Sequence, residues 1–160
     1  MTLYFAERPE DLATRDQLFS MSGLEFMQAM LRGEFAGPPM ARTLNFTLTD
    51  IAPGRAVFRG TPLFAFCNPM GAVHGGWYGA VLDSALGCAG MTMVPKGSWY
   101  TTLEYKVNIT RPLSLGTQVE CVANVQHAGR QTAVVEAVMK GVADGKTYAT
   151  GSTTCIILTA

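Results

Sequence analysis

The chain has 160 residues, 48% of them hydrophobic, and a formal net charge of zero, which fits a single domain with a sizeable core. The neutral charge argues against nucleic acid as a partner, because phosphate backbones require a basic face. With no uninterrupted apolar run of about 18 residues and no signal peptide at its start, the chain is expected to be cytoplasmic and to bind no membrane.

A short amphipathic helix is predicted over residues 22–33. Ser22 is the expected N-cap and Glu25 follows three residues later, the pattern of a capping box. Apolar residues at helical spacing follow, among them Met27 and Met30. We interpret these methionines as core or interface residues rather than as part of a ligand site.

From residue 43 onward the hydrophobic period changes to two. Residues 43–50 alternate apolar side chains, beginning at Leu44, with threonine and asparagine, which is typical of a half-buried strand. A Pro-Gly turn then leads to a second strand over residues 55–60, so the two strands are expected to form a hairpin. A loop over residues 61–73 follows.

Residues 74–90 are rich in alanine, leucine and valine and are bounded by glycines. This composition predicts a helix that is apolar on nearly all sides and therefore lies inside the protein. Its single acidic residue, Asp83, is costly to bury in the ionised form. Asp83 therefore needs either a structural partner or a chemical role.

Four more strands are predicted after this helix, over residues 100–112, 117–128, 131–141 and 146–159. The short polar segments between them indicate hairpin connections, so the sheet is expected to be antiparallel. Two strands, one buried helix and four strands indicate an α+β domain in which a curved antiparallel sheet wraps around a long central helix. This is the element order of the hot-dog fold.

The cysteines are spread widely along the chain, at Cys67, Cys88, Cys121 and Cys155. The sequence has no CxxC pair and only two histidines, so no metal site is expected. Because no export signal is present, we expect free thiols rather than disulfides.

The sequence NPMGAVHGG at residues 68–76, followed by Asp83, resembles the active-site signature of hot-dog acyl-CoA thioesterases of the phenylacetate-degradation type, which are similar to 4-hydroxybenzoyl-CoA thioesterases. The later strands are similar to those of the family as well, so the resemblance covers about residues 40–158. It implies a hot-dog thioesterase domain over residues 40–160, preceded by an N-terminal helical extension over residues 1–39.

The resemblance implies hydrolysis of an acyl-CoA thioester, with no cofactor besides the CoA of the substrate. By this resemblance, Asp83 is the general base or nucleophile, and the backbone N–H of Gly75 polarises the thioester carbonyl. Asn68 and His74 match the polar pair near the thioester and its leaving sulfur. Thr102 matches the residue that helps to orient the attacking water.

Helix geometry limits how these groups can cooperate. A helix N-terminus has unpaired N–H groups, and glycines there let an oxygen that gains negative charge approach closely. Asp83, however, lies about 12 Å farther along the axis than Gly75, too far for both to act on one carbonyl within one chain. Asp83 therefore serves a neighbouring subunit or takes no part in catalysis. The resemblance implies the first, in a homodimer or a dimer of dimers with shared active sites.

Each candidate also has a structural explanation. Asp83 could be satisfied by a local donor, and His74 could cap or pack against the helix. Asn68 before a proline is a common turn signal, and Thr102 fits ordinary β-propensity. For the whole protein, the alternative to a thioesterase is a hot-dog module that binds acyl groups or other ligands without turnover. A hydratase would need a paired Asp and His within one short motif, which the sequence lacks.

The acyl group itself is not identified by the sequence. Aromatic residues around the predicted central helix could line an aromatic or medium-chain pocket, or could simply pack in the core: Phe64, Phe66, Trp77, Tyr78 and Trp99.

Overall fold

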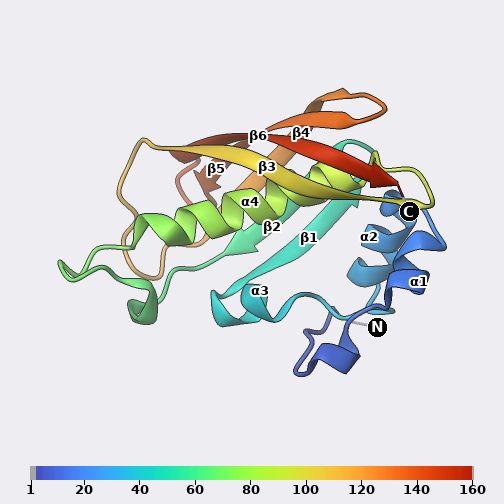
Figure 1. The fold of residues 1–160 in the computed structure, drawn as a ribbon. Coiled ribbons are helices and arrows are strands. Elements are labelled where there is room, and N and C mark those ends of the chain that lie inside the picture. The colour runs from blue at the N-terminus through green and yellow to red at the C-terminus, as the bar shows by residue number, and fades with distance from the viewer. Residues whose placement is uncertain (1–2, 160) are drawn as a thin grey trace.

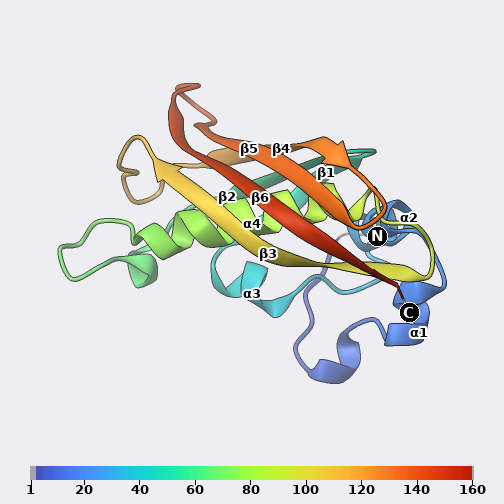
Figure 2. The same ribbon diagram turned by 45° about the horizontal axis from the view of Figure 1, so that its top comes forward.

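The computed structural model describes residues 3–159. Its strands are β1 (Phe46–Ala52), β2 (Arg55–Gly60), β3 (Ser98–Ile109), β4 (Val119–Ala128), β5 (Thr132–Gly141) and β6 (Thr147–Thr159). They form one antiparallel sheet in the order β1-β2-β4-β5-β6-β3. The long helix α4 (Gly75–Met91) packs against its inner face, and the sheet curves around it (Figures 1 and 2). The predicted α+β hot-dog fold is confirmed.

Short helices precede the sheet: η1 (Pro9–Asp11), α1 (Arg15–Phe19), α2 (Gly23–Leu31) and α3 (Pro39–Thr43). The predicted capping box of α2 is present, since the Glu25 N–H donates to the Ser22 hydroxyl and the Ser22 N–H donates to the Glu25 carboxylate. The other helices of this N-terminal segment (residues 3–43) were not predicted. They are short, so their sequences carry little periodicity.

The expected start of the first strand at residue 43 is wrong. Two prolines, Pro38 and Pro39, open α3, where their fixed φ and missing N–H fit the first turn of a helix. Leu44 ends that helix, and Asn45 has a φ of 56°, which redirects the chain into β1. The hairpin of β1 with β2 is confirmed.

The expected hairpin between the strands over residues 100–112 and 117–128 is also wrong. β3 pairs instead with β6, from Ser98 opposite Thr159 to Ile109 opposite Ala149. A strand has only two edges, and β4 uses both of its edges for β2 and β5. β3 therefore lies at the far edge of the sheet, where no other described strand covers its outer side.

One stripe of α4 is not fully covered by the sheet. From Trp77 to Met91 all residues are buried except four half-buried ones, spaced as along one helix face: Ala80, Asp83, Ser84 and Cys88. The prediction of a helix apolar on nearly all sides is correct apart from this stripe, which carries small and polar side chains.

The N-terminal segment is joined to the end of α4. The Gly23 N–H at the start of α2 donates to the Val94 carbonyl at 2.9 Å. A Cβ on Gly23 would lie only 1.9 Å from the Met91 carbonyl oxygen, so only glycine permits this approach. α1 and α2 consequently lie at the C-terminal end of α4, opposite the loop that precedes this helix (Figure 1). Within residues 3–159, no helix is long and apolar enough to cross a bilayer.

Candidate active site

The N-terminus of α4 has one amide that the chain leaves free. His74 is the N-cap, and its Nδ1 accepts the Gly76 N–H at 2.9 Å, while its carbonyl accepts the Trp77 N–H at 3.0 Å. Among residues 3–159 no acceptor binds the Gly75 N–H. A Cβ on Gly76 would come within 3.0 Å of Nδ1, so glycine leaves room for this cap.

This cap also fixes where the imidazole proton lies. Because Nδ1 of His74 accepts a hydrogen bond, the ring carries its proton on Nε2, which becomes a donor. His74 and the two following glycines are exposed. The helix start therefore presents a backbone donor and an imidazole donor on one exposed surface.

Asn68 organises the turn that leads into this helix. Its Oδ1 accepts the N–H groups of Met70 and Ala72, at 2.9 and 3.1 Å. The His74 N–H donates to the Phe66 carbonyl at 2.9 Å, and Cys67 forms an antiparallel bridge with Val73. These contacts close a small loop that contains Asn68 and ends at His74. The interpretation of Asn68 as a turn residue is thus correct, and its side-chain oxygen Oδ1 already accepts hydrogen bonds from this turn.

Asp83 and Thr102 meet half-way along α4. The Thr102 hydroxyl donates to Oδ1 of Asp83 at 3.4 Å, from a position next to a β-bulge of β3 between Thr102 and Glu104. Bulges re-aim side chains locally, which is consistent with Thr102 facing the helix. Burial raises the pKa of Asp83, and the bond from Thr102 partly opposes that rise.

The surroundings of Asp83 are apolar and contain weakly reactive groups. Burial raises the pKa of the Cys88 thiol to about 12, so this cysteine is a poor nucleophile. Burial also raises the pKa of Tyr100 well above its ordinary range. The Tyr100 hydroxyl passes over Gly87, where a Cβ would lie 2.3 Å from that oxygen, so it needs the glycine. Nothing in the sequence pattern indicated Tyr100.

The structure thus gathers the predicted residues into two groups. Asn68, His74 and Gly75 lie at the start of α4, whereas Asp83 and Thr102 lie in its middle. Asp83 lies eight positions after Gly75 along the helix, an axial distance of about 12 Å. One chain therefore does not bring both groups to a single carbonyl.

A cavity of about 410 Å³ opens beside Asp83. Ser84 and Cys88 line it from the half-buried stripe of α4, and Trp99 and Tyr100 line it from β3. Most of the remaining lining consists of apolar residues of the N-terminal segment.

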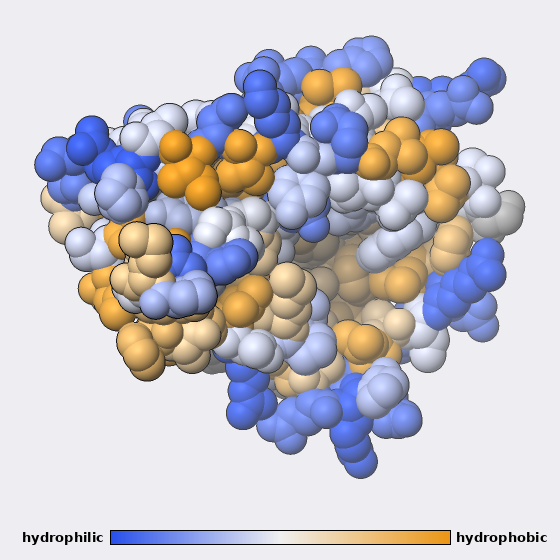
Figure 3. Space-filling model, turned by 60° about the vertical axis from the view of Figure 1, so that its left-hand side comes forward, coloured by the Kyte–Doolittle hydropathy of each residue, from blue (hydrophilic) through white to orange (hydrophobic). Residues whose placement is uncertain are grey.

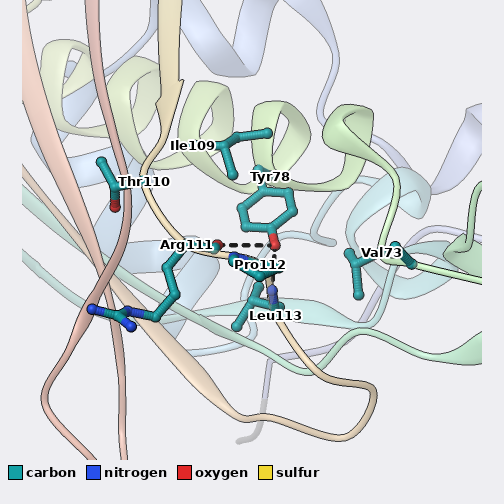
Figure 4. A pocket seen from close by; sticks show the side chains of 8 residues that line it. Val73, Tyr78, Ile109, Thr110, Arg111, Pro112 and Leu113 are labelled. Carbon is teal, nitrogen blue, oxygen red and sulfur yellow. Dashed lines mark hydrogen bonds between the residues drawn. The ribbon is translucent and has the colours of Figure 1, made fainter.

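A second cavity, of about 260 Å³, lies beside the start of α4 (Figure 4). The Tyr78 hydroxyl accepts the Leu113 N–H at 2.7 Å and donates to the Arg111 carbonyl at 3.5 Å. These bonds hold the segment after β3 against the helix. The Arg111 side chain extends away from Tyr78.

The sequence profile of the thioesterase superfamily matches residues 70–147, which include α4 and β3. The chain belongs to this superfamily. No curated protein sequence matches it.

Solved structures agree with this membership. This thioesterase-superfamily protein is 28% identical to a thioesterase family protein of Silicibacter pomeroyi, with a TM-score of 0.70 over 76% of this chain and 90% of the other. It is 29% identical to a variant of the phenylacetic acid degradation protein PaaI of Thermus thermophilus, with a TM-score of 0.68 over 74% and 97%. A conserved protein of Pseudomonas aeruginosa is 30% identical, with a TM-score of 0.69 over 74% and 93%.

The five aromatic residues of this superfamily member that the sequence singled out divide between the two cavities, the core and the loop before α4. Trp99 lines the larger cavity and Tyr78 the smaller one. Trp77 is buried, with its Nε1–H donating to the Leu44 carbonyl at 2.8 Å. Phe64 is 78% exposed in the loop before α4, and Phe66 lies in the same loop and lines neither cavity. The sequence did not predict that the N-terminal segment lines a cavity. Met27 and Met30, which we interpreted as core or interface residues, belong to that lining.

Proposed function

We propose that the protein hydrolyses the thioester of an acyl-CoA at a site that two subunits share. The observation that carries this proposal is the free Gly75 N–H at the start of α4, next to an amide that His74 already occupies. A free N–H at a helix N-terminus is suited to an oxygen that gains negative charge. Membership of the thioesterase superfamily supports thioester hydrolysis as the reaction.

In the proposed reaction, Asp83 removes a proton from a water molecule while the water oxygen bonds to the thioester carbon. The carbonyl oxygen becomes an oxyanion and accepts the Gly75 N–H. When the carbon–sulfur bond breaks, the Nε2–H of His74 stabilises the thiolate. The thiolate takes up the proton that Asp83 removed from water and leaves as the CoA thiol, with the acid as the second product and Asp83 ionised again. Thr102 orients Asp83 and the water. Direct attack by Asp83 would pass through an anhydride with the same products.

Two copies of β3 offer a simple way to complete such a site. Asp83 is held beside Thr102, whereas Gly75 lies beside Ile109, whose Cδ1 is 3.4 Å from the place of a Gly75 Cβ. In an antiparallel pair of β3 strands centred near Tyr105, Thr102 of one copy faces Ile109 of the other. The Asp83 of one subunit would then approach the Gly75 of its partner.

The exposed apolar side chains of this edge support a second copy as the partner. Leu103 is 58% exposed, and Tyr105 and Ile109 are exposed to a similar degree, on a strand whose outer edge no other described strand covers. Figure 3 looks towards the end of the molecule where α4 begins and shows apolar side chains gathered around a hollow. The unpaired backbone groups of an edge strand pair readily with another strand. A homodimer, or a dimer of dimers, is therefore proposed.

The test is thiol release from a panel of acyl-CoA substrates by the wild type and by Asp83→Asn. We expect the variant to lose at least about a hundredfold in turnover, because a positioned base or nucleophile commonly contributes that much. Asp16→Asn, on the exposed surface of α1, is the matched control and should retain wild-type turnover. A folded wild type that binds acyl-CoA without releasing thiol would contradict the proposal and indicate an acyl-binding module.

A further inference from the structure

The cavity beside Asp83 has no role in the reaction described so far, yet the proposed base lies in its wall. A thioester carbon placed at Asp83 would have its acyl substituent directed either to solvent or into this cavity. We infer that the cavity receives the acyl group, and that the N-terminal segment restricts it to uncharged acyl groups of roughly eight to twelve carbons. This inference rests on the proposed function.

The size of the cavity sets the length of the acyl group. A benzene ring occupies an apolar cavity of about 150 Å³. A volume of about 410 Å³ therefore has room for an aryl ring with several methylenes or for a medium-length aliphatic chain. An acetyl group would leave most of this apolar surface unfilled.

The charge of the lining excludes acyl groups that carry a second carboxylate. Of the described residues that line the cavity, Asp83 is the only one with a formally charged side chain. An ionised terminal carboxylate would be removed from water without a cationic partner, which is costly. An apolar acyl group meets mostly hydrocarbon and aromatic side chains instead.

The wall opposite α4 is held in place by aromatic and backbone contacts. The Phe26 ring of α2 lies 5.8 Å from the Trp99 ring and 5.3 Å from the Phe35 ring, measured between centroids. The Ala6 N–H donates to the Gly37 carbonyl at 2.9 Å, which ties the start of the N-terminal segment to the residues before α3. The N-terminal segment thus forms an ordered lining.

Met30 offers a direct kinetic test, because it lines the cavity from α2. Met30→Trp should fill the cavity and lower the ratio of kcat/KM for dodecanoyl-CoA over hexanoyl-CoA by at least about tenfold. Met30→Ala should raise the same ratio. Met21→Trp and Met21→Ala are the matched controls, since Met21 is also half-buried in the N-terminal segment but does not line the cavity. These controls should leave the ratio unchanged.

Trp99 provides a second readout that needs no turnover. The chain has two tryptophans, and only Trp99 lines the cavity. Saturable binding of the non-hydrolysable thioether S-decyl-CoA should change the tryptophan fluorescence, whereas S-methyl-CoA and S-(carboxynonyl)-CoA should not. Trp99→Phe should abolish the change.

The two readouts separate failure of this inference from failure of the proposed function. Thiol release with a chain-length ratio that neither Met30 substitution alters would overturn the inference and leave the hydrolysis intact. A Trp99 signal with S-decyl-CoA, without thiol release from any acyl-CoA, would support the cavity and overturn the hydrolysis. If the Met30 variants do not fold, an unchanged wild-type fluorescence on addition of S-decyl-CoA would by itself overturn the inference.

Discussion

The Thr102 hydroxyl donates a hydrogen bond to Oδ1 of Asp83 across 3.4 Å, which links the edge strand to the middle of the central helix. Burial raises the pKa of Asp83, and this bond lowers it because it favours the charged carboxylate. The two effects act on the same group in opposite directions. The pH dependence of the protein should therefore report on both.

Removing the hydroxyl of Thr102 should raise the pKa of Asp83 further. We expect Thr102→Val to shift the acid limb of the kcat/KM profile to higher pH, because a base must be deprotonated to act. Thr101→Val is the matched control, since Thr101 is exposed on the same strand. The measurement is thiol release across a pH series. An acid limb that stays in place in Thr102→Val would show that Asp83 does not limit the rate.

The raised pKa of Asp83 also has a consequence for stability. Because the folded state disfavours the charged carboxylate, the fold carries no penalty below the ordinary aspartate pKa and an increasing one as the pH rises through the folded pKa. Asp83→Asn should therefore raise the Tm at neutral pH and have little effect near pH 3. For a domain of this size, each kcal/mol of stability corresponds to a change in Tm of roughly 2–4 °C. Thermal denaturation at both pH values checks this, and a Tm gain that is equal at both would contradict it.

The role of the Gly75 amide can be tested with little disturbance of the helix. Gly75 is the first residue of α4, where proline is well tolerated, and His74 has a φ of −63° and a ψ of 138°, which suit a residue before proline. Gly75→Pro removes the N–H and should lower kcat by about a hundredfold to a thousandfold.

Gly75→Ala is the control for this change, because it adds a Cβ that meets Ile109 at an ordinary 3.4 Å but keeps the N–H. It should retain most of the activity. Circular dichroism should show equal helix content in both variants. Similar kinetic losses in the two variants would assign the effect to packing and count against an oxyanion role.

Sharing of the site between subunits predicts complementation. An Asp83→Asn chain and a chain carrying both His74→Ala and Gly75→Pro should each be inactive alone. After mild dissociation and reassociation of equal amounts, heterodimers contain one intact and one doubly defective site, so activity should return to roughly a quarter of wild type. Failure to recover activity, although mass spectrometry detects heterodimers of folded chains, would place the site within one subunit.

Local sequence signals predicted much of this fold. The capping box at Ser22 and the apolar composition after His74 located α2 and α4 closely, because caps and periodicity act within a few residues. The sequence favoured a hairpin between β3 and β4, because short polar segments between strands are a local signal. The actual pairing of β3 with β6 joins residues about fifty positions apart, which no local pattern reports. The same applies to the contact between Asp83 and Thr102: the family resemblance named both residues as site candidates, but no local pattern reports that they touch.

The candidate site was only partly accessible from the sequence. That His74 could cap the helix was open from the sequence, but histidine is not a usual N-cap, and its bond from the Gly76 N–H to Nδ1 needed coordinates. The cavity depends on how the N-terminal segment packs across α4, and residues such as Met30 look like ordinary core residues until that packing is known.

The contact of Gly23 with Met91 limits how the N-terminal segment can change during evolution. Any side chain at position 23 would collide with the carbonyl at the end of α4, so a substitution there would force α2 away from α4. A lineage that came to use a different acyl group would therefore be expected to exchange side chains facing the cavity while the backbone stays in place. Substitutions facing the cavity would then change the substrate range, while residues such as Gly23 that hold α2 against α4 would preserve the stability of the fold.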